Sequence, residues 1–551
     1  MNIPDPFPIS GNIVDVVNHR IFPGEVLVEH GRIKAISECK VKNSAFIMPG
    51  FTDAHIHIES SMLIPSGFAR LAVVHGTVGT VSDPHEIANV LGVEGVKYMI
   101  ENGKKVPFKF CFGAPSCVPA TDFETAGAEI DARGVEELMK MEEIKYLAEM
   151  MNFPGVLAGD EMIMRKLRAA QKYGKVVDGH APGLRGEDAR KYIEAGISTD
   201  HECYSKEEAL EKIKMGMKII IREGSAAKNF DVLIELLDQF PDHIMLCSDD
   251  KHPNDLVSGH VNLLARRAVE LGIKPMKVIR ALTYNPVKHY GLDAGLLQAG
   301  DPADLIVVNN LEEFRVISTY INGKKVADEG VSHIKPVQGD EINNFNCSKI
   351  SKSDIKPAIQ GATIRVIEAL DGQLITNEIL APANIIENTV VSDKENDILK
   401  MAVINRYHPS PPSIAFVKNF GLKKGAIASS VAHDSHNIIA VGVDDEDIVN
   451  AVNLLIENRG GISLTDEKEE LILPLPVAGL MSAGDGYQIA EKYELLDKKA
   501  KKLGSTLSSP YMTLSFLALL VIPQLKLSDK GLFDGDKFQF TSLFAEENVR
   551  C

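Results

Sequence analysis

Apolar residues recur with two different periods between residues 49 and 250, and the two periods alternate along the chain. Short apolar runs typical of strands end near His57, Pro84, Ala114, Met150, His180, His201, Gly224 and Asp249. Between these runs, apolar residues recur every three or four positions, as in amphipathic helices, over residues 134–141, 162–168, 206–213 and 230–237. Alternating strands and helices predict an α/β fold with a parallel sheet, and eight strands predict a closed (β/α)8 barrel of the TIM type.

The segments on either side of this region carry short strand patterns of another kind. Residues 25–36 indicate a hairpin around Gly31, and residues 316–326 indicate a similar hairpin around Gly323. We expect both flanks to combine into one small β-sandwich beside the barrel. A polar stretch, residues 338–357, is a predicted linker to a last domain of mixed strands and helices.

The length of the chain supports this division. At 551 residues it is too long for one hydrophobic core. The predicted units are a composite β-sandwich, a barrel and a C-terminal α+β domain, at residues 1–48 with 300–337, 49–299, and 358–551, respectively.

Composition narrows the class of protein. The 59 Lys and Arg against 76 Asp and Glu give a formal net charge of −17, which disfavours nucleic acid and anionic membranes as partners. No apolar stretch is long enough to span a bilayer, and the N-terminus carries no signal-peptide pattern. The seven cysteines contain no Cys-x-x-Cys pair. We therefore expect a cytoplasmic enzyme, and a homo-oligomer.

Four of the predicted strands end in residues that can bind a divalent cation. His55 and His57 lie one residue apart after a buried strand, so their side chains point to the same face. The runs before His180, His201 and Asp249 end in the same way. Imidazole and carboxylate suit Zn, Mn or Fe, and barrel enzymes keep their active sites at these strand ends. Each residue alone is more often structural, but together they indicate a metal site.

The residues around these ligands resemble a known family. Residues 49–61, Pro-Gly-Phe-Thr-Asp-Ala-His-Ile-His-Ile-Glu-Ser-Ser, look like the opening signature of the amidohydrolase superfamily, and the Glu-Ser-Ser tail resembles bacterial adenine deaminases. Other stretches resemble the same family at residues 82–89, 148–155, 179–182, 248–250, 405–408 and 430–437. The resemblance implies a deaminase that hydrolyses adenine to hypoxanthine and ammonia with a dinuclear divalent metal centre, of Mn or Fe with Zn as a third option.

The resemblance also implies a ligand set. His55, His57 and Asp249 would hold one ion, and His180 and His201 the other. Many relatives bridge the two ions with a carboxylated lysine at the end of the fourth strand, where this chain has Glu149.

Glu149 is the predicted bridge, because a carboxylate can join two cations unaided. Lys145 shares its face of the strand but lies a little over ~13 Å deeper, at about 3.3 Å per residue. The alternative for Glu149 is an exposed carboxylate on the loop after the strand.

The expected chemistry follows from such a centre. A bound metal lowers the pKa of its water to roughly 7. The resulting metal-bridging hydroxide would attack C6 of adenine, and Asp249 would move its proton as general base and then general acid. Glu149 and Asp249 are thus the predicted catalytic residues.

Recognition of the purine is predicted at the second strand. Asp83, His85 and Glu86 follow it and face the same mouth of the barrel. The alternative for Asp83 is a helix N-cap, with Pro84 at the first helical position. Glu59 and Ser60 are expected to orient the metal ligands.

The last domain carries its own histidines. His408, His433 and His436 would suffice for another metal, but surface or packing roles are more frequent. We favour a loop that caps the barrel mouth and places His433 and Asp434 near the substrate.

Three alternatives stay open from the residues. A cyclic amidase of the same superfamily is the first. An N-acetylglucosamine-6-phosphate deacetylase is the second, and it would need basic residues for the phosphate, for which Arg222 and Lys228 are the candidates. The third is a non-catalytic barrel module. A small-molecule purine, as the free base, is favoured over a nucleoside on resemblance alone.

Overall fold

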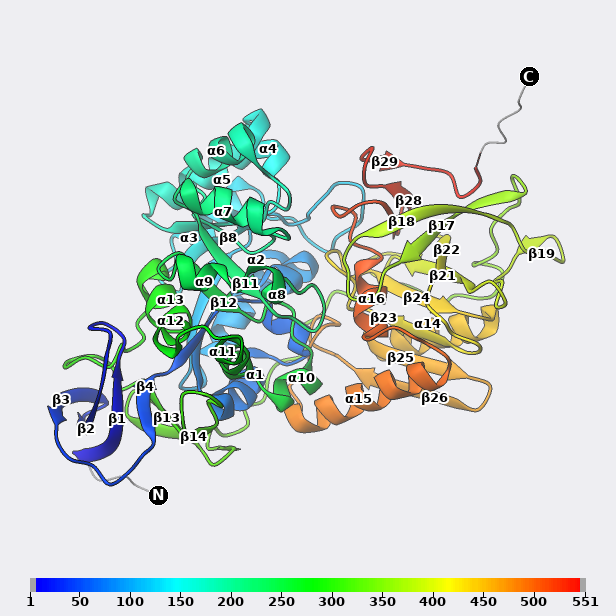
Figure 1. Ribbon diagram of the computed structural model, residues 1–551. Helices are drawn as coiled ribbons and strands as arrows, with labels where there is room; N and C mark the ends of the chain where they lie inside the picture. Colours follow the sequence, from blue (N-terminus) through cyan, green and yellow to red (C-terminus); the bar gives the residue numbers. More distant parts are fainter. Residues whose placement is uncertain (1–5, 546–551) are drawn as a thin grey trace.

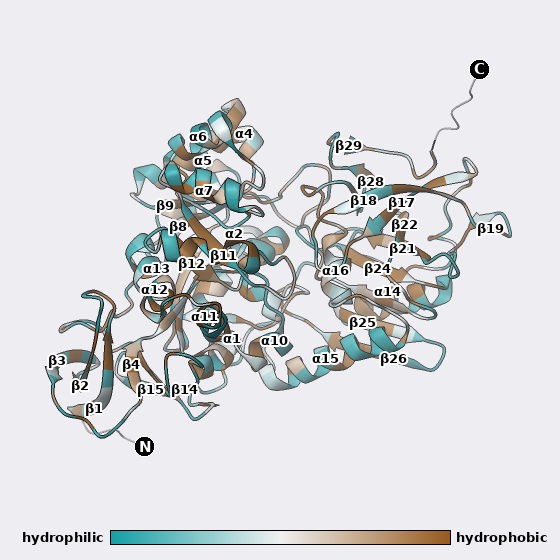
Figure 2. Cartoon of the chain, in the orientation of Figure 1, coloured by the Kyte–Doolittle hydropathy of each residue, from teal (hydrophilic) through white to brown (hydrophobic). Residues whose placement is uncertain are grey.

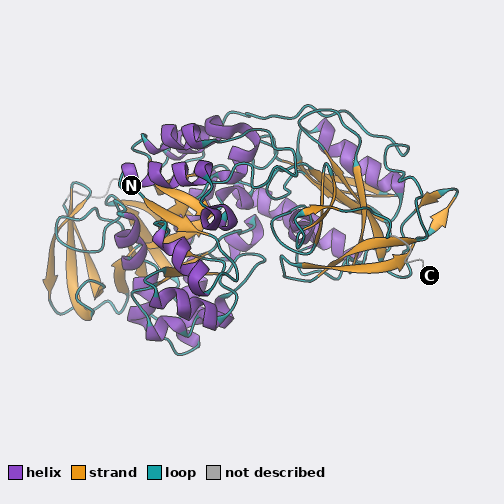
Figure 3. Ribbon diagram, turned by 90° about the horizontal axis from the view of Figure 1, so that it is seen from above, coloured by secondary structure: helices purple, strands orange, loops and turns teal. Residues whose placement is uncertain are grey.

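The computed structural model describes residues 6–545 and arranges them as three units in a row (Figure 1). A small sheet that contains the first strands of the chain lies at one end, the barrel lies in the middle, and a β-rich domain lies at the other end. Figure 3, seen from above, shows the same row, with helices surrounding the strands of the central unit. Within the described residues, no helix combines the length and apolar character needed to cross a membrane.

The barrel consists of eight parallel strands in chain order: β5 (Phe51–Ile56), β6 (Thr77–Ser82), β7 (Lys109–Ala114), β8 (Ile144–Met150), β9 (Val176–Gly179), β10 (Thr199–Asp200), β11 (Lys218–Arg222) and β12 (Ile244–Cys247). Strands β5 to β9 pair as one sheet and β10 to β12 as another. Bridges between Val177 and Ile197 and between Ile56 and Asp249 join the two sheets at both seams. The predicted parallel barrel is therefore confirmed, and each strand ends within two residues of the expected position.

Helices cover the outside of the barrel: α1 (Pro65–Ala72), α2 (His85–Gly103), α3 (Ala132–Met139), α4 (Phe153–Ala158), α5 (Glu161–Lys172), α6 (Gly186–Glu194), α7 (Lys206–Lys214), α8 (Phe230–Leu233), α9 (Leu236–Gln239), α10 (Pro253–Ser258), α11 (Val261–Glu270), α12 (Pro275–Ala281) and α13 (Tyr284–Tyr290). Their outer faces are largely hydrophilic, while the strands beneath are hydrophobic (Figure 2). Side chains of Asp131, Asp160 and Ser205 cap α3, α5 and α7 by accepting backbone N–H groups. The single helix expected over 230–237 is divided into α8 and α9.

The two flanks meet in one mixed sheet of eight strands: β1 (Phe7–Asp15), β2 (Arg20–Glu29), β3 (Arg32–Glu38), β4 (Phe46–Pro49), β13 (Leu305–Val308), β14 (Val316–Ile321), β15 (Lys324–Asp328) and β16 (Val331–Ser332). Strand β4 joins the flanks, because it pairs with β1 on one side and β13 on the other. The hairpin β2–β3 contacts the segment before β13, because Ile33 N–H donates to the carbonyl of Asp301 at 2.9 Å. The two flanks therefore combine as expected, and they form one continuous sheet where the sequence predicts a sandwich.

The C-terminal domain is built on a second sheet of eight strands: β17 (Thr363–Ala369), β18 (Thr376–Pro382), β21 (Ile398–Ile404), β22 (Ser413–Lys418), β23 (Ala426–Ser429), β24 (Ile438–Gly442), β25 (Gly461–Asp466) and β26 (Glu469–Pro474). The remaining elements are β19 (Ile385–Ile386), β20 (Thr389–Val390), α14 (Asp445–Glu457), α15 (Gly486–Lys502), α16 (Pro510–Phe516), β27 (Leu525–Ser528), β28 (Gly531–Asp534) and β29 (Gln539–Phe540). This confirms the expected mixture of strands and helices.

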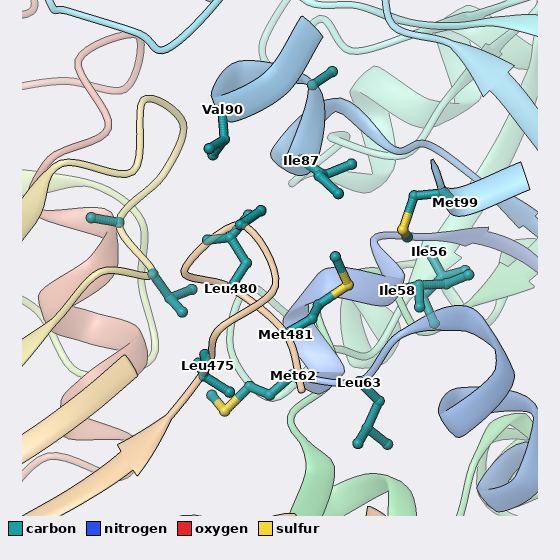
Figure 4. Packing of buried hydrophobic residues seen from close by; sticks show 14 of the residues in the cluster. Ile56, Ile58, Met62, Leu63, Ile87, Val90, Met99, Leu475, Leu480 and Met481 are labelled. Atoms are coloured by element: carbon teal, nitrogen blue, oxygen red, sulfur yellow. The ribbon is translucent and has the colours of Figure 1, made fainter. Parts of the chain in front are cut away.

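The barrel and the C-terminal domain share one apolar core. In Figure 4, Ile58, Met62 and Ile87 of the barrel lie close to Leu480 and Met481 of the C-terminal domain. All five side chains are buried. Burial of apolar surface is worth about 25 cal/mol per Å², so this contact holds the last domain firmly against the barrel.

The predicted linker, residues 338–357, has no strand or helix but is not detached from the domains. Within it, Phe345 and Ile355 are buried, and Asn346 N–H donates to the carbonyl of Arg406 at 2.7 Å. The stretch therefore packs along the C-terminal domain.

Candidate metal centre and active site

The six predicted ligands come together at the C-terminal mouth of the barrel. They lie at or just after the ends of five strands, as His55 and His57 (β5), Glu149 (β8), His180 (β9), His201 (β10) and Asp249 (β12). All are buried except His180, which is half-buried. Parallel strands end at one edge of the sheet, so stretches of chain far apart in sequence deliver their side chains to one place.

His55, His57 and Asp249 form the first group. The Nε2 atoms of the two histidines lie 3.2 Å apart, and Asp249 Oδ1 lies 3.6 Å from Nε2 of His55 and 3.3 Å from Nε2 of His57. His57 Nδ1–H donates to the backbone carbonyl of Asp83 at 3.1 Å. Because a carbonyl only accepts, the neutral ring carries its lone pair on Nε2, facing the group. This is how metal-binding histidines are commonly oriented.

Glu149 links this group to the remaining histidines through its two oxygens. Oε1 lies 3.3 Å from His57 Nε2, and Oε2 lies 2.7 Å from His180 Nδ1 and 3.1 Å from His201 Nε2. Burial raises the pKa of this carboxyl, but His201 and the hydrogen bond from His180 outweigh burial and hold the pKa well below its usual value. The carboxylate is therefore ionised and faces two sets of imidazoles. Lys145 is exposed at the start of β8 and does not reach them.

Glu202, which was not predicted as a site residue, and Arg222, which was named only as a candidate for a phosphate, complete the cluster. Glu202 Oε1 lies 3.7 Å from His180 Nδ1 and 3.6 Å from His201 Nε2. Arg222 pairs with Glu202 and donates to Asp249 Oδ2 at 2.7 Å. Both residues lie at the ends of barrel strands, and this position is the signal that could have identified them.

Asp249 has a strained backbone. Its φ of 51° lies in the left-handed region, which Asp tolerates better than most residues. Asp249 N–H donates to the carbonyl of His55 at 3.0 Å, which fixes this conformation. Burial raises the pKa of its carboxyl, but the Arg222 guanidinium outweighs burial and holds the pKa well below its usual value. Strained residues often mark functional sites.

The residues after β6 lie beside Glu149. His85 Nδ1 is 3.0 Å from Asp83 Oδ2 and 3.3 Å from Glu149 Oε1, and its Nε2 is 3.5 Å from Glu86 Oε1. The predicted N-cap role of Asp83 is wrong, because α2 begins at His85 with Pro84 as its N-cap and no side chain caps it. The Asp83 carboxylate binds the His85 ring instead.

Glu59 and Ser60 lie just behind the ligands, as expected. Glu59 Oε1 accepts the N–H of Ile87 at 3.2 Å, and Ser60 donates its hydroxyl hydrogen bond to Asp250. Their bonds tie the segment after β5 to α2 and to the residue next to Asp249.

The C-terminal domain closes the mouth with a loop between β23 and β24. His433 Nδ1 lies 2.5 Å from Glu86 Oε1, and His436 contacts the other oxygen of Glu86. Asp434 Oδ1 lies 3.9 Å from His85 Nε2. This is the capping arrangement predicted from the sequence. His408 is exposed and lies outside it.

The remaining wall of the pocket is apolar. It is formed by Met151 of the barrel and by four residues of the C-terminal domain, Leu374, Phe516, Leu519 and Val521.

The donor set fits a divalent metal. The described residues include three overlapping groups with mutually close ligand atoms: His55–His57–Asp249, His55–Glu149–His201 and His180–His201–Glu202. Imidazole nitrogens and carboxylate oxygens are the ligands preferred by Mn, Fe and Zn. The two Nε2 atoms of His55 and His57, 3.2 Å apart, are placed where one cation could bind both.

The barrel, its strand-end ligands and the buried pocket define a metal-dependent hydrolase. A sequence model of the amidohydrolase family matches residues 46–326, and one described as "Adenine deaminase C-terminal domain" matches residues 373–539. The chain therefore belongs to the amidohydrolase family and contains the C-terminal domain of its adenine deaminases.

Curated relatives match almost the whole chain. It is 54% identical to a protein of Methanosarcina mazei over 98% of this chain and 99% of that one, and 52% identical to a protein of Salinibacter ruber over 99% and 100%; both are named adenine deaminase. A solved N-acetyl-D-glucosamine-6-phosphate deacetylase of Mycobacterium smegmatis is similar at 16% identity and a TM-score of 0.45, covering 58% of this chain and 100% of that one. That likeness adds nothing to the assignment.

Proposed function

We propose that this protein hydrolyses adenine to hypoxanthine and ammonia. The observation that supports the proposal best is that the sequence similarity covers nearly the whole chain. Relatives named adenine deaminase match 98–99% of the chain, including the C-terminal domain whose loops line the pocket. The substrate is thus a small neutral purine.

The residues that would hold the metals are His55, His57 and Asp249 for one ion, and His180 and His201 for the other, with Glu149 between them. When bound, divalent ions lower the pKa of a coordinated water to roughly 7 and so supply the nucleophile. We propose Mn or Fe, with Zn as a third option.

Asp249 is the proposed proton carrier. Arg222 binds its Oδ2 at 2.7 Å, whereas its Oδ1 faces the histidines. Oδ1 is therefore the oxygen that faces the metal ligands and would take a proton from the attacking water. As the water oxygen bonds to C6 and the C6–N bond breaks, Asp249 returns the proton to the amine, which leaves as ammonia.

Asp83, His85 and Glu86 are the proposed purine contacts. Burial lowers the pKa of His85, but Asp83 and Glu86 outweigh burial and raise it well above its usual value. His85 is then an imidazolium that can donate to a ring nitrogen. Asp83 holds the ring of His85 in place, and Glu86 ties it to the capping loop.

The pocket chemistry weighs against the sugar-phosphate alternative. Arg222 is neutralised by Glu202 and Asp249, and Lys228 is exposed and pairs with Glu223 at 3.4 Å. Neither basic residue is free for a phosphate. The homo-oligomer stays a prediction.

The test is ammonia release from adenine by the apo protein before and after addition of Mn, with acetate release from N-acetylglucosamine 6-phosphate and ring opening of cyclic amides measured in parallel. We expect Mn-dependent ammonia release only. Acetate release or ring opening would replace the proposal, and no transition metal bound after growth with Mn or Fe would favour the non-catalytic module.

A further inference from the structure

The loop that closes the pocket presents an unused hydrogen-bond acceptor. Asp434 is only 4% exposed, and its Oδ2 has no hydrogen-bond partner among residues 6–545. Buried polar atoms are nearly always paired, and leaving one unpaired costs about 1–3 kcal/mol, more for a charged group. A buried carboxylate oxygen that lines a ligand pocket therefore calls for a donor from the ligand.

The position of Asp434 is fixed by contacts on both sides of the loop. His433 and His436 bind the two oxygens of Glu86. Asn437 Nδ2 donates to the carbonyl of Thr125 at 2.9 Å, which ties the loop to the barrel. The acceptor is thus held in place before a ligand arrives.

The distance between Asp434 and the metal ligand Glu149 suits the length of a purine. The ring of His85 separates the two carboxylates, because Nδ1 lies 3.3 Å from Glu149 Oε1 and Nε2 lies 3.9 Å from Asp434 Oδ1. A purine with C6 beside Glu149 would extend its five-membered ring in the direction of Asp434. The side chains of Phe516, Leu519 and Val521 give the same pocket an apolar wall.

We propose that Asp434 accepts the ring N–H of the five-membered half of adenine and thereby selects the free base. This rests on the proposed function. Free adenine carries one N–H on this ring, at N7 or N9, whereas a nucleoside carries none. A site built to bind a substrate N–H can reject analogues that lack it by about 10⁴–10⁵, because its own polar group is then left unpaired.

The test compares adenine with the isostere 7-aminothiazolo[5,4-d]pyrimidine, which keeps the nitrogen at the N7 position and has sulfur in place of the N–H at N9. The ratio of kcat/KM for the two compounds is measured in Mn-loaded wild type, Asp434→Ala and Asp434→Asn, with Ki used where turnover is too slow. We expect Asp434→Ala to lower the value for adenine by about 10- to 100-fold, the worth of a charged hydrogen bond, and to leave the isostere nearly unchanged. Asp434→Asn retains an acceptor oxygen and should restore part of the preference.

A matched control is Asp529→Asn. Asp529 is a buried carboxylate of the same domain that accepts from Asn405 and Thr125 at 2.9 Å, and it does not line the pocket. Its ratio should equal that of wild type. An unchanged ratio in Asp434→Ala, or an equal loss for both compounds, would overturn the inference while leaving the proposed function intact. Absence of ammonia release from adenine by the wild type would remove the proposed function itself.

Discussion

Replacing Glu149 by Gln tests the centre of the proposed site. The substitution keeps the shape of the side chain and removes one negative charge. In the structure this charge faces four imidazoles, at 3.3 Å from His57 and His85, 2.7 Å from His180 and 3.1 Å from His201. The amide would also turn an N–H₂ group toward rings that need an acceptor or a shared cation.

The size of the effect follows from burial. Removing one partner of a buried ion pair costs about 3–5 kcal/mol, which corresponds to about two to three and a half orders of magnitude in an equilibrium constant. Because both ions would share this carboxylate, metal affinity should fall by at least this factor. We expect the desalted variant to hold one ion or none per chain, and kcat/KM for adenine to fall by about 10²-fold or more.

The assay is metal analysis of Mn-loaded, desalted protein together with ammonia release from adenine. Glu124→Gln is the matched control, because Glu124 is also buried. Burial and, next, the charge of Asp434 raise the pKa of Glu124 well above its usual value, so this residue is a neutral acid and an amide resembles it. This control should keep its metal. Full metal content and wild-type turnover in Glu149→Gln would refute the bridging role.

Three further outcomes are expected. Asp249→Asn should lose about 10²- to 10⁴-fold in turnover, as general acid–base residues do; wild-type turnover with metal still bound would refute its role. A chelator should abolish ammonia release and lower the thermal unfolding midpoint, because a ligand that binds only the folded state stabilises it. Addition of Mn should restore both. An unchanged midpoint would argue against a buried metal centre. Lys526 is buried and donates to the carbonyls of Leu374 and Phe516 in the pocket wall at 2.6 and 3.1 Å. Lys526→Met should therefore raise KM for adenine more than it lowers kcat. The control is Lys400→Met, at another fully buried lysine, which should change stability alone. Burial lowers the pKa of Lys526 to about 7, below about 10.4 in the unfolded chain. Between these pH values the unfolded state binds more protons than the folded state, so the wild type should gain stability over Lys526→Met from pH 7 to pH 9. Denaturant unfolding measures this difference, and a constant difference would contradict the expectation.

The barrel could be predicted because its signal is local and repeated. Each strand is a short apolar run with a polar residue at its end, and each helix has its own apolar face. Even β10, which has two residues, is marked by the His201 that follows it. The division of 230–237 into α8 and α9 could not be foreseen, since the apolar positions continue through the break.

The ligand positions were predictable for the same reason, but their partners were not. Glu202 and Arg222 follow neighbouring strands and become a pair only when β10 and β11 lie side by side. Asp83 carried a sound local signal for an N-cap. The His85 ring two residues away competes for the same carboxylate, and the tertiary contact of His85 with Glu149 decides the outcome.

The pocket is closed by ion pairs between residues that lie far apart in the sequence, so no local sequence pattern predicts them. Glu86 lies at the start of α2, and its partners His433 and His436 lie almost 350 residues later in another domain. Burial raises the pKa of Glu86, but these two histidines and His85 outweigh burial and hold it well below its usual value, so the buried carboxylate is ionised. The barrel supplies the metal ligands, while the last domain both neutralises this buried charge and supplies the apolar wall. Both domains therefore line the pocket at the barrel mouth, although the six ligands of the predicted dinuclear centre belong to the barrel.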